Sequence, residues 1–189
     1  MGEGVDRSLV MAARSGDEEA FGSLVRGSAD RLFAVAHRIL RDVGRAEDAV
    51  QQTLVTAWRE LPGLREAERF DAWLHRILVH ACYAEARRAR RWSVNVRALP
   101  VDGPAARDTT LDVVLRDALD RGFRRLPPEQ RAVFVFHHYL GLSLGEIADT
   151  LDVALGTVKS RLHYATNALR AALDADARST TVTSRERMA

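Results

Sequence analysis

Six polar side chains near the C-terminal end of the sequence share one predicted helix, and all of them can hydrogen-bond to a nucleic acid. They are Thr157, Lys159, Ser160, Arg161, His163 and Tyr164. Hydroxyl, ammonium, guanidinium and imidazole groups of this kind contact DNA phosphates and base edges. Val158 and Leu162 fall on the other side of the helix, where they can anchor it in a core. The pattern indicates a helix that can lie in the major groove of DNA.

The residues before this helix predict how the chain presents it. Leu144, Ile147 and Leu151 recur at helical spacing, and Ser143 with Glu146 three residues later forms a capping box that marks a helix start. Asp152 follows, where a tight turn needs a residue that tolerates left-handed dihedrals. These features predict a helix-turn-helix. Pairs of short amphipathic helices also occur in all-α domains that bind no nucleic acid, so the motif alone leaves both interpretations open.

A second basic surface lies on the helix predicted over residues 70–91. Its members follow one another at steps of three and four residues and so share one stripe: Arg76, His80, Tyr83, Arg87 and then Arg90 or Arg91, with Arg88 adding to the basic end. Arginines with interleaved aromatic rings suit a nucleic-acid backbone and an unpaired base. The alternative is a solvated face whose arginines favour the helix C-terminus through its dipole. Beside a separate helix-turn-helix, two DNA-facing surfaces are the better explanation.

The remaining pattern predicts an all-α chain of two small helical domains joined by a flexible linker. Apolar residues at helical spacing mark helices over residues 21–40, 46–61 and 111–119, and Pro128 fits the first turn of another. Residues 92–109 lose this periodicity and contain two prolines and a glycine, which is typical of a linker. The polar residues after Leu173 predict a frayed tail.

Composition excludes several classes of protein. The formal net charge is only +2, so a nucleic-acid surface must come from local clustering. The single cysteine, Cys82, excludes an intrachain disulfide and a multi-cysteine zinc site, and its apolar helix face predicts a buried thiol. The sequence shows no signal-peptide pattern and no apolar run of membrane-spanning length, so we expect a cytoplasmic protein without membrane insertion.

The histidines do not predict a catalytic or metal site. His137 and His138 are adjacent, and His75 and His80 are five residues apart, so neither pair has the four-residue spacing of a helical metal site. The sequence also has no Gly-rich phosphate loop and no nucleophile elbow. We expect no enzyme activity, no cofactor and no metal, with the histidine pair on a helix surface or satisfied in a core.

Three stretches, in order, resemble the extracytoplasmic-function (ECF) class of bacterial RNA polymerase sigma factors in the sigma-70 family. "AEDAVQQTLVTAWREL" is similar to sigma region 2.2, "FDAWLHRILVHACYAEARRARR" to regions 2.3 and 2.4, and "LPPEQRAVFVFHHYLGLSLGEIADTLDVALGTVKSRLHYA" to region 4. The resemblance covers nearly the whole chain. It implies a region 2 domain over residues 1–91, the linker over 92–109, a region 4 domain over 110–175 and a tail over 176–189.

The resemblance also implies a task for each surface. The helix over residues 47–58, whose outward side is mixed and polar, would bind the clamp coiled coil of the polymerase beta-prime subunit through Glu47, Asp48, Gln51, Gln52, Val55 and Trp58. Phe70, Trp73 and the basic stripe would capture unpaired bases of the −10 promoter element. The helix from Thr157 would enter the major groove at the −35 element. Implied partners are core RNA polymerase (beta-prime and beta subunits), promoter DNA and, as a candidate, an anti-sigma factor, in transcription initiation of a stress- or signal-responsive set of genes.

Three positions depart from the family pattern. His80 stands where Asn is frequent, Tyr164 where the recognition helix often continues with Arg, and Ala154 where Pro is common. The −10 base preference and the −35 sequence therefore do not carry over. A stand-alone transcription regulator, such as a response-regulator output domain, shares the "EIA…TVK" pattern, but such a regulator would not need the first helical block.

Overall fold

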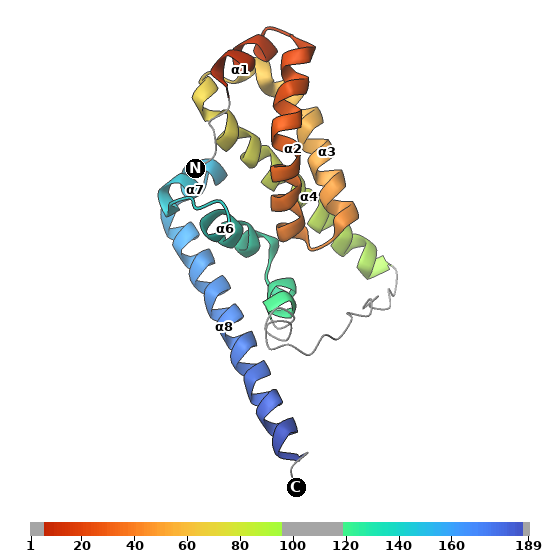
Figure 1. Cartoon of the computed structure of the whole chain (residues 1–189), viewed down its shortest axis with the longest axis vertical. Helices are drawn as coiled ribbons and strands as arrows, with labels where there is room; N and C mark the ends of the chain where they lie inside the picture. Colours follow the sequence, from red (N-terminus) through yellow and green to blue (C-terminus); the bar gives the residue numbers. More distant parts are fainter. Residues whose placement is uncertain (1–5, 96–118, 187–189) are drawn as a thin grey trace.

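The computed structural model describes residues 6–95 and 119–186, with side chains over residues 6–91 and 119–175, and all regular elements of this part are helices (Figure 1). The longer ones are α1 (Arg7–Arg14), α2 (Glu18–Leu40), α3 (Val43–Glu60), α4 (Phe70–Asn95), α6 (Pro128–His138), α7 (Leu144–Leu151) and α8 (Leu155–Glu186). Two short 3-10 turns, η1 (Leu61–Gly63) and η2 (Ala67–Arg69), connect α3 to α4. The all-α prediction is confirmed.

Aspartates begin the first three helices. In each case a side-chain carboxylate accepts a hydrogen bond from a backbone N–H in the first turn. Asp6 accepts from Ser8 at 2.8 Å, Asp17 from Glu19 at 2.9 Å and Asp42 from Arg45 at 2.9 Å. Each bond satisfies a backbone donor that has no partner inside its helix. The pattern of apolar residues did not predict α1, because its eight residues are too few for a clear helical repeat.

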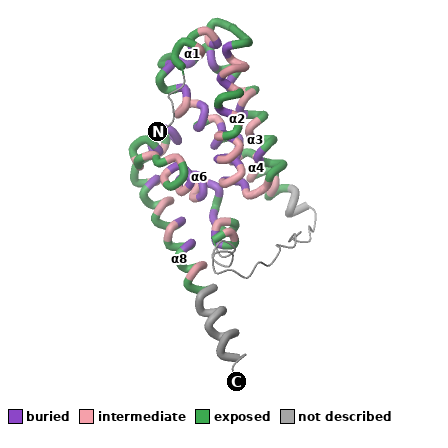
Figure 2. The backbone as a smooth tube through the Cα atoms, in the orientation of Figure 1, coloured by how far each residue is buried: buried purple, intermediate pink, exposed green. Residues whose placement is uncertain are grey.

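One continuous core joins the two halves of the chain. Leu32, Ile39 and Leu78 from α2 and α4 belong to the same buried cluster as Phe136 of α6 and Val158 of α8. The buried positions shown in Figure 2 accordingly follow the inner sides of the helices in both halves. The helix-turn-helix half therefore packs against α2 and α4 in this structure.

Two helix ends lie further along the chain than predicted. α4 runs to Asn95, beyond the expected linker start at Trp92, while residues 96–118 lie outside the described residues. The backbone of α8 is helical to Glu186, although the polar tail was expected to fray. No Pro or Gly follows Gly156, so nothing in the sequence forces the helix to stop earlier. None of the described helices is long and apolar enough to cross a membrane.

Candidate nucleic-acid interface

The predicted helix-turn-helix is present and begins with the predicted cap. Oγ of Ser143 accepts a hydrogen bond from the N–H of Glu146 at 3.3 Å, and the Glu146 carboxylate accepts one from the N–H of Ser143 at 2.8 Å. The hydrogen bonds from Ser143 lower the pKa of Glu146. Asp152 then adopts φ 53° and ψ 52°, and α8 starts at Leu155. The capping box and the left-handed turn residue, both confirmed, set the direction in which α8 leaves α7.

α8 separates its apolar side from its predicted DNA contacts. Val158, Ala165 and Leu169 are buried, and Leu162 packs against the core. The polar set is open to solvent to differing degrees, with Lys159, Ser160, His163 and Tyr164 exposed and Thr157 and Arg161 half-buried. Oγ of Ser160 donates to the carbonyl oxygen of Thr157 at 3.0 Å, which restrains its hydroxyl. The anchoring role predicted for Val158 and Leu162 is confirmed.

The basic stripe on α4 is exposed along most of its length. Its exposed members are Arg76, His80, Arg87, Arg88, Arg90 and Arg91. Tyr83 differs, because its hydroxyl is buried without a hydrogen-bond partner among the described residues, and this burial raises its pKa. Its ring lies edge-on to that of His80, with the centroids 6.5 Å apart. Tyr83 therefore packs beneath the exposed His80, and its buried hydroxyl is not part of the exposed surface.

Phe70 is not on this surface. Its side chain is only 2% exposed and belongs to the core, which corrects its assignment as a −10 contact. Phe70 is the first residue of α4, and its ring packs against that of Trp73 with the centroids 5.8 Å apart. Trp73 lines a hollow of about 280 Å³ with Arg65, Arg69 and Arg76 of the neighbouring loop and helix. Glu66 and Asp149 also line this hollow, so Phe70 positions Trp73 beside three arginines and two carboxylates.

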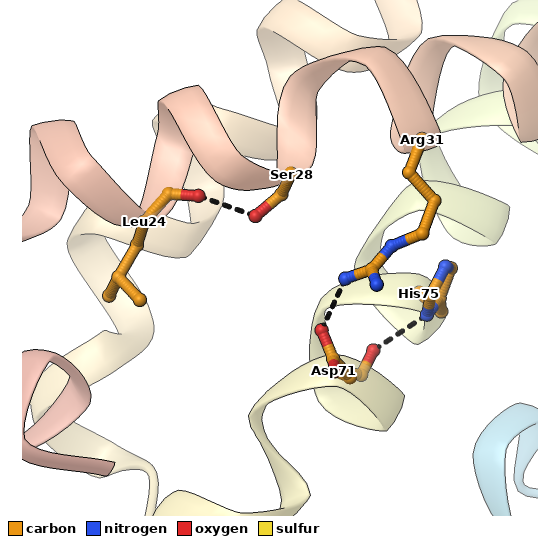
Figure 3. A network of polar contacts seen from close by, with 5 residues as sticks. All are labelled: Leu24, Ser28, Arg31, Asp71 and His75. Atoms are coloured by element: carbon orange, nitrogen blue, oxygen red, sulfur yellow. Dashed lines mark hydrogen bonds and ion pairs between the residues drawn. The ribbon is translucent and has the colours of Figure 1, made fainter. Parts of the chain in front are cut away.

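A polar network that the sequence did not reveal fixes the start of α4 against α2 (Figure 3). Nη2 of Arg31 donates to the carboxylate of Asp71 at 2.6 Å. Nδ1 of His75 lies 2.8 Å from the carbonyl oxygen of Asp71, and its other ring nitrogen is buried without a partner. Burial, followed by the nearby Arg31 cation, lowers the pKa of His75. This environment favours the neutral imidazole, and the ring of His75 faces Phe136 of α6.

α3 presents the mixed surface predicted for it. All six side chains predicted for it are exposed: Glu47, Asp48, Gln51, Gln52, Val55 and Trp58. The indole of Trp58 is 37% exposed and its ring centroid lies 4.9 Å from that of Phe21, so α2 supports it from behind. The two carboxylates disfavour phosphate, and the large apolar side chains among polar neighbours are suited to a protein partner.

The helix that carries the basic stripe contacts the helix-turn-helix in this structure. Nη2 of Arg76 on α4 is 2.8 Å from the carboxylate of Asp152, the turn residue of the helix-turn-helix. Nearby, the ring of His75 meets that of Phe136 edge-on, with the centroids 5.7 Å apart. Asp149 and Thr150 of α7 also line the hollow that holds Trp73. These contacts fix the helix-turn-helix against α4 in this arrangement.

The remaining candidate groups take structural roles. Cys82 is buried as predicted, and burial raises its pKa to about 12. Nδ1 of His137 lies 2.9 Å from the carbonyl oxygen of Leu142, and His138 is exposed beside Phe134, 4.3 Å between ring centroids. Within the described ranges no three potential metal ligands come together.

Both halves match known protein families. A family model described as "Sigma-70 region 2" matches residues 24–92, and one described as "Sigma-70, region 4" matches residues 116–169. The chain is 38% identical over 173 residues to the ECF RNA polymerase sigma factor SigL of Mycobacterium tuberculosis, covering 86% of this chain and 96% of SigL. It is 36% identical over 166 residues to the ECF RNA polymerase sigma factor SigE of Mycolicibacterium smegmatis, which covers 82% of this chain but only 63% of SigE.

The fold also matches a solved complex. The sigma factor RpoE of Bartonella quintana, in complex with the anti-sigma factor NepR, superimposes with a TM-score of 0.64. Its sequence identity to this chain is 26%, and the match covers 82% of this chain and 96% of RpoE.

Proposed function

The chain belongs to the extracytoplasmic-function RNA polymerase sigma factors of the sigma-70 family, and on this basis we propose that it binds core RNA polymerase through α3 and directs it to promoters through α4 and α8. The observation that carries the proposal is the division of chemistry among three helices. α3 exposes a mixed surface with two large apolar side chains, whereas α4 and the start of α8 expose basic and hydroxyl groups. A single stand-alone DNA-binding domain would need only one of these surfaces.

The α3 surface would dock on the polymerase clamp. Trp58 and Val55 supply apolar area, and Glu47, Asp48, Gln51 and Gln52 surround them. Aromatic anchors with a polar rim are typical of protein interfaces. Such a contact would place α4 beside the opening promoter.

The α4 surface would hold the melted −10 element. Trp73 and the arginines around its hollow offer a ring for stacking and cations for the backbone. The exposed part of the stripe from Arg76 to Arg91 continues this surface along the helix. His80 lies at the middle of the stripe, within reach of a base edge.

The α8 surface would read the −35 element. Arg161 carries the planar fork that matches a guanine edge, and Lys159 is suited to a phosphate. α4 and the helix-turn-helix touch through Arg76 and Asp152, and promoter binding would separate the two halves so that they can reach two promoter elements. An anti-sigma factor is a candidate partner, because the RpoE relative is found in complex with one. The cytoplasm, where the polymerase acts, is the proposed location.

In vitro transcription with purified core polymerase on genomic DNA tests this function. We expect start sites that share −35 and −10 sequences and that appear only when both the chain and core polymerase are present. Tight, sequence-selective promoter binding by the free chain, or no stable complex with core polymerase, would instead favour a stand-alone regulator.

A further inference from the structure

A cavity of about 300 Å³ lies where the two halves of the chain meet, and every charged residue that lines it is an arginine. These residues are Arg45, Arg90, Arg124, Arg125 and Arg131. Arg45 lies near the start of α3 and Arg90 near the end of α4, whereas the other three belong to the half that carries the helix-turn-helix. The cavity therefore brings cations from both halves to one place.

Arg131 is the innermost of these cations. Arg131 is only 9% exposed and its Nε is buried without a partner. Its side chain forms no hydrogen bond or ion pair with any described residue, and only its backbone N–H donates, to the carbonyl oxygen of Pro127. Burial lowers the pKa of Arg131 most, and the Arg41 cation lowers it further. Glu129 raises it, with a larger effect than the opposite one of Arg90. A buried charge without a partner is costly, because the water that it loses is not replaced.

Two carboxylates near the cavity, those of Asp120 and Asp42, form ion pairs with arginines other than Arg131. Asp120 forms an ion pair with Arg41 and accepts a hydrogen bond from Nε of Arg124 at 3.2 Å. Asp42 lies 3.8 Å from Nε of Arg45. Two arginines thus share Asp120, and neither carboxylate reaches Arg131. The charged residues that line the described cavity are all arginines, and the nearby Glu129 acts on Arg131 without forming an ion pair with it.

We propose that this cavity binds an oligophosphate anion, the diphosphate or triphosphate group of a nucleotide, with Arg131 as its innermost contact. Guanidinium forks match phosphate oxygens in pairs, and the several charges of an oligophosphate suit converging arginines better than one carboxylate does. The volume is at the lower end of small-ligand sites, roughly 300–1,000 Å³. It accommodates a phosphate chain more readily than a DNA duplex.

The anion would act as a regulator beyond the proposed promoter function. Because its arginine contacts come from both halves, binding stabilises the arrangement in which α4 touches the helix-turn-helix. A ligand that binds only one of two arrangements shifts the population toward it. Oligophosphate should therefore oppose promoter engagement.

Calorimetric titration of the full chain with sodium tripolyphosphate tests the site, with sulfate at matched ionic strength as the reference anion. We expect saturable one-to-one binding of tripolyphosphate, at least tenfold tighter than that of sulfate. Arg131→Gln should weaken it at least tenfold, and Arg124→Gln, whose side chain is largely exposed and whose loss leaves the core unchanged, by a smaller factor. Arg26→Gln removes one exposed positive charge outside the cavity and should change the affinity less than twofold.

The same titration distinguishes a specific site from general attraction to positive charge. Equal binding of sulfate and tripolyphosphate, or equal loss of affinity in the Arg26 and Arg131 variants, would overturn the proposal. A nucleoside triphosphate should compete with tripolyphosphate for the site. If a short DNA duplex displaces tripolyphosphate and Arg131→Gln weakens duplex binding equally, the cavity belongs to the DNA backbone and the oligophosphate assignment is wrong.

Discussion

Nη2 of Arg76 and Oδ2 of Asp152 lie 2.8 Å apart, although 76 positions separate these residues in the sequence. This ion pair links Arg76, proposed to face the −10 element, to the turn of the helix-turn-helix proposed to bind the −35 element. It also ties the helix-turn-helix to α4, so breaking it should favour separation of the two halves. Because both side chains are substantially exposed, the pair contributes at most about 1 kcal/mol.

Asp152→Asn should therefore loosen the contact without disturbing the turn, because Asn tolerates the left-handed conformation that Asp152 adopts. The single thiol, Cys82, is buried and lies close enough to Arg131 of α6 for their charges to interact, so separation of the halves should help to expose it. We expect Asp152→Asn to accelerate the reaction of Cys82 with a thiol reagent by no more than about fivefold, the factor equivalent to 1 kcal/mol. An unchanged rate, with the full thiol count recovered in denaturant, would mean that this ion pair does not hold the halves together.

Arg161→Ala should relax the preference for particular −35 sequences. Loss of a bidentate contact to a guanine costs roughly 1–3 kcal/mol of discrimination. Lys159→Ala should instead weaken all sequences about equally and reduce the salt dependence, because a phosphate contact carries no sequence information. Run-off transcription on promoters changed one base pair at a time measures both effects. An unchanged profile for Arg161→Ala would move the recognition role to Ser160 or Tyr164.

Charge reversal on α3 should weaken binding to core polymerase. Glu47→Lys with Asp48→Lys changes two exposed side chains, and exposed substitutions usually alter stability by only about 0.5 kcal/mol. Asp30→Lys reverses an exposed charge on α2 and serves as the control, with affinity measured by fluorescence titration of labelled core enzyme. If both proteins bind core polymerase with wild-type affinity and keep their helicity, α3 is not the docking surface.

His75 should make the folded state less stable in mild acid. Its pKa is lowered from 6.5 by burial, so the unfolded chain binds a proton at a higher pH than the folded chain does. The contribution of neutral His75 is complete above the unfolded pKa and is lost as the pH falls below about 6.5 toward the lower folded value. Denaturant unfolding of the wild type should thus show a free energy that falls from pH 7.5 to pH 5.

His75→Gln should reduce this pH dependence, because Gln does not titrate. Partial desolvation also lowers the pKa of His138, so His138→Gln measures the share of the pH dependence that this exposed histidine contributes. If the pH dependence is unchanged in His75→Gln but disappears in His138→Gln, the loss of stability in acid is due to His138 and the prediction for His75 is wrong.

Local signals predicted the helix-turn-helix correctly, because each depends on neighbouring residues. The Ser143 and Glu146 cap, the left-handed Asp152 and the apolar side of α8 were all readable from spacing. Phe70 was misplaced because a resemblance transfers positions without saying which side chains are turned into the core.

Long-range packing was not predictable from one sequence. His75 and Phe136 are in contact although 61 positions separate them in the sequence, and neither their residue types nor their spacing predicts this contact. Arg131 follows "LPPEQ" like an ordinary helix-surface residue, yet it is buried where the two halves meet. Its burial depends on how the halves pack, and spacing along one helix contains no such information.

The exposure of Lys159 has a practical consequence, because it is the only lysine in the chain. All other basic side chains except the histidines are arginines, which keep their charge across the working pH range and do not react as amines. An amine-directed dye or cross-linker can therefore react with only one side chain of the protein. That side chain lies on the helix proposed to enter the major groove, so protection of Lys159 from such a reagent would footprint promoter DNA at a single, known position.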